Sequence, residues 1–482
     1  MILQDKKMNT YERFVSEFKG LNRLPVISEG ELMECMNMEF DLYPAMTVRK
    51  EVQSILTNLH SDDADVCSGM LATEEGIYYV FCGELRLFRE NGGWVTVMSD
   101  LSPREKSIVK FWDKIFVFPD KKYYDTTTGE TGDMGEGEFP QDGSVPDIDY
   151  AIVHNNRIWG VKGSYIYASA NGWAMGSESP AGIQGWVPGY DGMGYPNDLG
   201  ACWFEVASSG DFTGISSWDD RIIALKKDYH YEITGSVPSN FELSTVSRCG
   251  TISNNTICEV NGRLYYLSSV GVMSYGGGYE VNIGRKLNID WSRIAIIAAY
   301  STKTPLCGAG GDGEKYYLTC ALNDDENERH TYVYDTNLDM WTEWNGESLG
   351  FFFSYLNGDL YAADFIGNIN KLSHARNGSD ISLGWSFTFS DYDGSVFRQT
   401  RPAVLILKLK GTPGSLVKVE MTDRDGADFK IIKEITLSDG VIRDVKCPIT
   451  RGGEHIFRVS GDKNVIVFGY YLKVQDGGAT NG

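Results

Sequence analysis

The histidines are the side chains most able to bind a metal ion or to act as a general base near neutral pH. The chain has six of them, at His60, His154, His230, His330, His374 and His455. None stands at the H-x-x-x-H or H-E-x-x-H spacing that places two metal ligands on one helical face. A metal site or a Ser-His-Asp triad could still assemble in space, but we interpret the six as surface or strand residues and expect no bound metal.

Glycoside hydrolysis needs a pair of carboxylates, and acidic residues are plentiful in this chain. Asp113, Asp219 and Asp220, however, recur just before apolar strand patterns, where aspartate side chains commonly cap a turn. The segments SDYDGSVF (390–397) and TDRDGADF (422–429) approach the sialidase box S-x-D-x-G-x-x-W but are out of register with it. The spacing therefore indicates turn chemistry, and we predict that the protein is not an enzyme.

Three acidic runs, at 61–65, 323–328 and 423–428, could supply oxygen ligands to calcium. The last contains a D-x-D-G fragment but lacks the remaining spacing and the distal glutamate of an EF-hand loop. The glycine run at 276–278 lacks the lysine and hydroxyl residues of a phosphate-binding loop. These segments are typical of solvated hairpin loops, and we expect no cofactor.

Length and charge limit what the chain can be. Its 482 residues exceed what one ordinary hydrophobic core fills, so two domains or one large repeat fold are expected. With 44 Lys and Arg against 66 Asp and Glu, the formal charge of -22 repels phosphate and excludes nucleic-acid coating as a main task. Nine scattered cysteines without a C-x-x-C spacing indicate reduced thiols. No secretory signal or bilayer-spanning apolar run is evident, so we expect no membrane insertion.

A repeated pattern of turn, apolar-aromatic strand, turn and second strand runs through the middle of the chain. The seven copies can be aligned on their first strand residues, which are Ile77, Ile115, Ile158, Ile222, Leu264, Tyr316 and Leu360. The intervals between them are 38, 43, 64, 42, 52 and 44 residues. A period of about 40 to 50 residues with paired strands is typical of propeller blades of four strands. The sequence therefore predicts an all-β protein with a seven-bladed β-propeller over 66–383.

The longest interval contains an insertion at about 168–214 that is rich in Gly, Pro and Trp. We interpret it as a surface loop, and its Trp173, Trp186 and Trp203 form a candidate binding surface for stacking ligands. Two further tryptophans, Trp341 and Trp344 in YVYDTNLDMWTEW, are expected to fill the wedge between blades rather than to form a ligand platform.

The two ends of the chain differ from the repeats. Residues 384–482 contain at least five cleanly alternating strands, which predict a C-terminal β-sandwich. Residues 1–65 are predicted to form an N-terminal arm with short helices at 10–18 and 28–38. A segment near 66–75 is the predicted strand that closes the last blade.

Several phrases occur together in a familiar order. They are FKGLNRLPVISEGELMECMNMEF from Phe18, GDFTGISSWDDRIIALKKDYHYEITGSVPSNFEL from Gly210, YVYDTNLDMWTEW from Tyr332 and FRVSG from Phe457. In this order the chain, from 17 to 475, resembles the propeller-bearing structural proteins of tailed bacteriophages, of the tail-hub or packaged-DNA stabilisation class. The shared motifs belong to the framework and include no catalytic residue.

The resemblance implies a structural virion protein of the tail or of the head-to-tail junction, made in the host cytoplasm. Its expected partners are other virion tail or portal proteins, and a homo-oligomeric ring or several copies for each particle are expected. The alternative is a carbohydrate-binding adaptor or glycan hydrolase at the phage tail tip that uses the tryptophan-rich insertion. A cellular kelch-type interaction module is a third hypothesis, which the arm and the appended sandwich disfavour.

The net charge is distributed unevenly between the two ends of the chain. From Gly384 onward we count 14 Lys and Arg against 12 Asp and Glu, which leaves 30 against 54 on the arm and the repeats. The acidity therefore belongs to the predicted propeller. DNA is expected at most as a passing neighbour, and proteins are the expected ligands.

Overall fold

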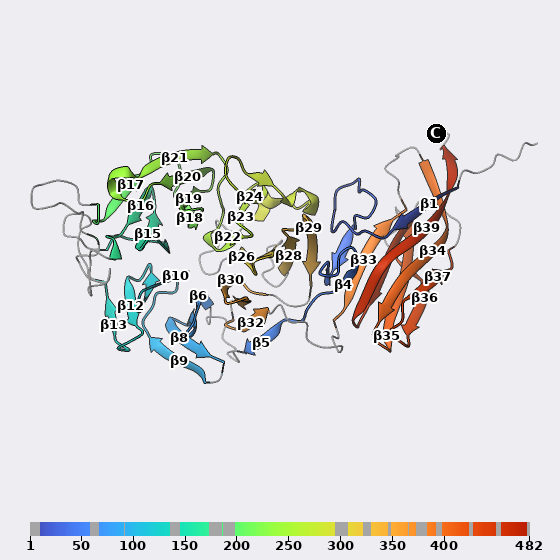
Figure 1. Ribbon diagram of the computed structural model, residues 1–482, viewed down its shortest axis with the longest axis horizontal. Helices are drawn as coiled ribbons and strands as arrows, with labels where there is room; N and C mark the ends of the chain where they lie inside the picture. Colours follow the sequence, from blue (N-terminus) through green and yellow to red (C-terminus); the bar gives the residue numbers. More distant parts are fainter. Residues whose placement is uncertain are drawn as a thin grey trace, which may run out of the picture.

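The computed structural model describes residues 10–57, 67–90, 92–134, 145–172, 186, 198–294, 307–321, 329–345, 349–364, 366–372, 383–391, 398–423, 428–449 and 455–479. Strands dominate these residues, as the sequence predicts, and the chain is an all-β protein (Figure 1). Among the described residues, no helix is long and apolar enough to cross a bilayer.

The middle of the chain folds into repeated antiparallel units, of which the first five are sheets of four consecutive strands. Four of these sheets are β6 (Cys67–Thr73) to β9 (Gly93–Met98), β10 (Ser107–Phe111) to β13 (Thr131–Asp133), β14 (Tyr150–His154) to β17 (Cys202–Glu205) and β18 (Phe212–Trp218) to β21 (Glu242–Ser247). They are followed by β22 (Cys258–Val260) to β25 (Val281–Asn282), β26 (Cys307–Gly311) to β29 (Met340–Trp344) and β30 (Phe352–Leu356) to β32 (Ile369–Leu372).

The turns that join the first two strands of these units explain why the sequence repeats there. Asn156, Asp220, Asn261 and Asn357 all have positive φ, between 50° and 58°. Asn, Asp and Gly tolerate this left-handed conformation, which two-residue hairpin turns require. The interpretation of Asp219 and Asp220 as turn residues is therefore confirmed, since their φ values are 47° and 58°.

The first strands of the units lie side by side around a common centre, and we call them the inner strands. Each contacts the inner strand of the next unit, directly or through the short turn Asn254–Thr256 before β22, and β30 lies beside β6. Glycine permits this close approach: a Cβ on Gly308 would lie 2.0 Å from the Phe351 carbonyl oxygen. This propeller-like arrangement occupies one end of the long axis of the molecule (Figure 1).

The N-terminal arm consists of short strands, so the predicted helices at 10–18 and 28–38 are wrong. The first becomes β1 (Thr10–Val15), and the second contains β2 (Glu34–Met36) and the start of β3 (Met38–Glu39). Two of these strands pair with distant segments: β1 with β39 (Val465–Ala479), and β2 with both β29 and β33 (Trp385–Ser390). Tertiary pairing therefore overrides the local helical pattern.

The closing strand of the last four-stranded sheet is also different from the prediction. β5 (Gln53–Leu56) from the arm pairs with β32 and completes the sheet that begins with β30. The segment predicted for this role, near 66–75, instead forms β6, the inner strand of the following sheet. The predicted segment begins 13 residues after the start of β5, because β5 is short and its apolar side chains are only half-buried.

The C-terminal region contributes strands to two larger sheets. One sheet has the order β3-β4-β39-β34-β37, with β1 at its side, and the other continues from β26–β29 through β2 into β33-β38-β35-β36. The strands not yet bounded are β4 (Met46–Val48), β34 (Arg398–Gly411), β35 (Ser415–Asp423), β36 (Lys430–Leu437), β37 (Arg443–Cys447) and β38 (His455–Gly461). Side chains such as Leu405, Leu407, Phe387 and Phe457 from these sheets share one buried core.

The predicted insertion at about 168–214 contains regular structure at its end. Cys202–Glu205 is β17, and β18 begins at Phe212, so the long connection is the one between β16 (Tyr165–Ala168) and β17. The packing role predicted for Trp341 and Trp344 is confirmed, since both are buried and the Trp341 Nε1 donates a hydrogen bond to the Ile283 carbonyl oxygen at 2.9 Å.

Candidate functional site: the turn face

The turns between the first and second strands of the units gather at one end of the inner strands, and we call this surface the turn face. Its turns are at 74–75, 112–113, 155–156, 219–220, 261–262, 312–314 and 357–358. Hydrogen bonds join neighbouring turns: Trp112 Nε1 donates to Asn156 Oδ1 at 3.2 Å, and Trp218 Nε1, at the end of β18, donates to the Gly262 carbonyl oxygen at 2.9 Å. These bonds fix neighbouring turns relative to one another.

The composition of the turn face follows from its geometry. Because left-handed turn positions favour Asn, Asp and Gly, the same requirement that builds each hairpin also fills the surface with hydrogen-bond acceptors and carboxylates. Asp219 and Asp220 are in this conformation, and Asp113, Asp312 and Glu314 stand beside a left-handed residue in the other turns. The face is therefore acidic, and it favours a cationic or hydrogen-bond-donating partner over an anionic one.

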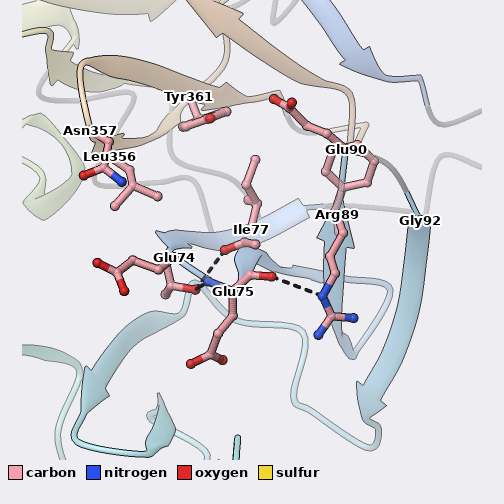
Figure 2. A pocket seen from close by; sticks show the side chains of 12 residues that line it. Glu74, Glu75, Ile77, Arg89, Glu90, Gly92, Leu356, Asn357 and Tyr361 are labelled. Carbon is pink, nitrogen blue, oxygen red and sulfur yellow. Dashed lines mark hydrogen bonds between the residues drawn. The ribbon is translucent and has the colours of Figure 1, made fainter.

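A hollow in the turn face lies between the turn at 357–358 and the hairpins of the β6–β9 sheet (Figure 2). It is a cavity of about 560 Å³. Glu74, Glu75 and Glu90 supply carboxylates to its wall, and Phe88 and Tyr361 supply apolar surface. The wall is therefore amphipathic, with more acidic than basic groups.

Ion pairs hold two of these carboxylates in place. Glu75 accepts hydrogen bonds from Lys110 Nζ at 2.6 Å and from the Tyr78 hydroxyl at 2.8 Å. Burial alone would raise the pKa of Glu75, but these two donors hold its pKa below the ordinary value. Glu90 is bound by Lys371 Nζ at 3.2 Å. Glu74 is exposed, so its charge is the one most available to a partner.

The tryptophans predicted to form a binding surface are not equivalent. Trp186 is fully buried in an apolar cluster with Val145 and Ile148, so its predicted role in a stacking surface is wrong. Trp203 on β17 is 40% exposed, and Trp173 lies outside the described residues. The sequence pattern could not separate these cases, because a tryptophan in a Gly-rich segment packs inward or outward according to distant contacts.

The connection that carries these tryptophans leaves directly from the turn face. The Gly172 amide donates to the Asn156 carbonyl oxygen at 2.8 Å, and Asn156 Nδ2 donates to Asn171 Oδ1 at 3.1 Å. Trp112, which is 42% exposed, stands beside this point. Sequence reasoning overlooked Trp112 because it occupies a turn position that holds Asn or Asp in most of the other units.

The described histidines sit in the framework. His230 is buried with its Nδ1 2.7 Å from Glu280 Oε1, and His330 Nδ1 is 2.6 Å from Glu343 Oε1. His60 and His374 lie outside the described residues, as do the acidic runs at 61–65 and 323–328 and most of the run at 423–428. Within the described ranges, no group of three or more His, Cys, Asp and Glu is placed to hold a metal ion.

A separate polar group, centred on Glu105, lies at the opposite end of the inner strands, in the loop that leads into β10. Burial raises the pKa of Glu105 to about 7, with Asp149 acting in the same direction and Asn255 opposing it. Cys307 on β26 is close enough for the two groups to influence each other electrostatically. The Glu105 carboxyl group can hold or release a proton near neutral pH, and no sequence motif marks this residue.

Comparisons with known proteins provide no family assignment. No family model and no curated protein matches the sequence. Among solved structures, PorZ, a surface component of the type-IX secretion system of Porphyromonas gingivalis, aligns with a TM-score of 0.41 and 11% identity over 71% of this chain and 45% of that chain. BamB from Moraxella catarrhalis aligns with a TM-score of 0.40 and 11% identity over 76% of this chain and 100% of that chain.

A third solved structure is the extracellular domain of a hybrid two-component system protein from B. thetaiotaomicron. It aligns with a TM-score of 0.43 and 9% identity, over 86% of this chain and 59% of that chain. The chain thus spans less than two thirds of the length of PorZ and of this domain. Likeness at this level carries no inference about function.

Proposed function

We propose that the repeats form a seven-bladed β-propeller and that the C-terminal strands form a β-sandwich. The closed order of contacts among inner strands supports the propeller, with β5 completing the blade that begins with β30. The shared core between β33-β38-β35-β36 and β39-β34-β37 supports the sandwich.

We infer that the protein is a structural virion component of a tailed bacteriophage, located in the tail or in the head-to-tail junction. The observation that carries the proposal is the joint between the two β regions. β2 from the arm lies between β29 and β33, so a single nine-stranded sheet runs through both regions. A continuous hydrogen-bonded sheet resists bending, as a load-transmitting part of a particle requires.

Buried polar contacts reinforce this joint. Glu343 on β29 is 1% exposed and pairs with Arg23 of the arm, whose guanidinium also donates to the Tyr332 hydroxyl at 3.3 Å. A second set joins Lys315 on β27 (Lys315–Ala321) to Asp41 and Glu39. Burial would raise the pKa of Asp41, but Lys315 and Lys50 lower it to about 2. The Asp41 carboxylate therefore stays ionised at any physiological pH.

In this proposal the propeller presents the turn face to protein partners, namely other tail or portal proteins. The acidity of the propeller lets DNA pass as a neighbour without binding tightly. The test is to purify phage particles that encode this chain, digest them, and identify their proteins by mass spectrometry. A defined, repeated number of copies in each particle is expected. Absence of the chain from intact particles would overturn the proposal.

The second candidate function is glycan binding at a tail tip, by an adaptor or a hydrolase. It is favoured by the exposed rings of Trp112 and Trp203, since sugar rings stack on aromatic faces. If it holds, the Trp112→Ala and Trp203→Ala variants should lose binding to host-surface polysaccharide, whereas Trp186→Ala should only lower stability. Equal glycan binding by wild type and both exposed-site variants would reject it.

A further inference from the structure

The outer side of the C-terminal region carries an apolar groove where β39 changes its pairing partner. β1 pairs with β39 up to Tyr470, whereas β4 pairs with it at Val467 and Ile466. Gly469 between them has a φ of 151°, and a Cβ there would lie 2.2 Å from the Val15 carbonyl oxygen. The resulting cavity has a volume of about 430 Å³, and we call it the β39 groove.

The walls of the β39 groove are aromatic and aliphatic. They include Phe14, Ile406, Phe468 and Tyr471. The Phe14 ring is 68% exposed, although it lies 4.7 Å from the Tyr471 ring. Leaving such a ring in water forfeits the free energy of burying it, which a partner surface would recover.

The rim of the groove is basic. Lys408 lines the cavity, and Lys410 and Lys446 are exposed on the same face of neighbouring strands. No ion pair is found between these three lysines and another residue in the described part of the chain. Asp444 is the one carboxylate among the residues that line the cavity.

We propose that the β39 groove of one copy docks on the acidic turn face of a second copy, around the cavity lined by Glu74 and Glu90. The groove offers exposed lysines around an apolar centre, and the turn-face cavity offers carboxylates around Phe88 and Tyr361. The two surfaces are therefore complementary both in charge and in the position of their apolar parts.

The distribution of charge selects this pairing over symmetric ones. The arm and repeats carry 30 Lys and Arg against 54 Asp and Glu, so two turn faces repel each other. The C-terminal region carries 14 against 12, so two grooves gain no electrostatic attraction. Contact between unlike ends is the arrangement in which charge favours association, and such a heterologous contact produces a ring or an open chain of copies.

This inference rests on the proposed function only in placing the contact inside a phage particle. The contact itself should form between purified copies of the chain. The first measurement is the mass of the full-length wild-type protein in solution, by light scattering and sedimentation over a range of concentrations and salt. Association that weakens at least about tenfold between low and high salt is expected. A wild-type protein that stays monomeric at the highest concentration would overturn the proposal.

The decisive experiment uses two complementary variants. Phe14→Glu with Lys408→Glu disables the groove, and Glu74→Lys with Glu90→Lys disables the turn-face cavity. Each variant alone should be monomeric, whereas an equimolar mixture should form pairs that contain one copy of each and grow no larger. Formation of these pairs also demonstrates that both variants are folded.

The matched control is Lys430→Glu, which reverses an exposed lysine on β36, in the other C-terminal sheet. It should associate as the wild type does. Three outcomes would each refute the docking. The first is loss of association in this control, and the second is failure of the mixture to pair although both variants unfold as cooperatively as wild type. The third is a symmetric dimer that survives the Glu74 and Glu90 changes. Particle composition does not enter these outcomes, so failure here is distinguishable from failure of the virion proposal.

Discussion

The propeller-like region and the C-terminal region use the same N-terminal arm in different ways. In the propeller-like region the arm contributes β5, whose residues Gln53 and Ser54 are exposed and whose other two are half-buried. In the C-terminal region and the joint it contributes buried side chains, among them Phe18, Leu32, Cys35 and Met38, all 0% exposed. The arm thus seals one region and forms part of the core of the other.

This difference indicates where each region obtains its stability. The propeller-like region consists of repeated local hairpins, so most of its contacts are made between neighbouring strands in sequence. The joint depends on pairs more than 300 residues apart, such as Arg23 with Glu343 and Glu34 with Thr388. We therefore expect substitutions in the joint to have the largest effects and those in β5 the smallest.

The largest expected effect comes from Arg23→Ala in the joint. It leaves the carboxylate of Glu343 buried with His330 and without its guanidinium partner, which should lower the free energy of unfolding by about 3 kcal/mol. Chemical denaturation of the full chain measures this loss. The control is Arg443→Ala, which breaks an exposed ion pair with Asp439 and should leave stability close to that of the wild type. Equal losses in the two variants would contradict the importance of the buried pair.

Sequence reasoning predicts the repeats well and the joint poorly, for a physical reason. Each repeat combines a strand pattern with a turn residue such as Asn261 or Asn357, so its signal is local. β2 has only three residues, and its position depends on β29 and β33, which the surrounding pattern does not encode. The arm was therefore predicted to be helical where it is extended.

The next largest effect tests how closely the inner strands approach one another. Gly308→Ala places a Cβ 2.0 Å from the Phe351 carbonyl oxygen, so the inner strands β26 and β30 must separate. A loss of about 2 kcal/mol in the free energy of unfolding is expected. Gly384→Ala is the matched control, because a Cβ there meets no atom within 4 Å. A stability of Gly308→Ala within error of the control would show that the inner strands are loosely packed.

The candidate site was predictable in composition but not in location. Turn chemistry alone accounts for the carboxylates at Asp219 and Asp220, and the sequence pattern predicts it. The cavity depends on which turns become neighbours, and the sequence does not specify that Asn357 faces Glu74. The exposure of Trp203 and the burial of Trp186 likewise follow from tertiary packing.

The stability of the propeller-like region should depend on pH through Glu105. The folded pKa of Glu105, about 7, lies above the ordinary value near 4.5, so its deprotonation destabilises the fold as pH rises from about 4.5 to 7. Glu105→Gln should therefore raise the free energy of unfolding at pH 8. The side chain is only half-buried, so solvent screens part of the effect, and the expected gain is about 1–2 kcal/mol. The gain should vanish at pH 4. Unfolding curves at both pH values measure it, and an equal gain at both would refute the assignment.

The smallest effect should come from the strand that closes the ring. Ile55 on β5 is half-buried and packs against the cluster that includes Phe352 and Ile369, so Ile55→Ala should cost about 1 kcal/mol. Because β5 lies at a sheet edge, the loss should appear first as faster amide hydrogen exchange in β32, while exchange in β33 and β38 stays unchanged. Ile442→Ala, at an exposed position in the C-terminal region, controls for removal of the same side chain. Faster exchange across β33 and β38 in Ile55→Ala would mean that β5 and the joint unfold as one cooperative unit. The arm would then not contribute separately to the two regions.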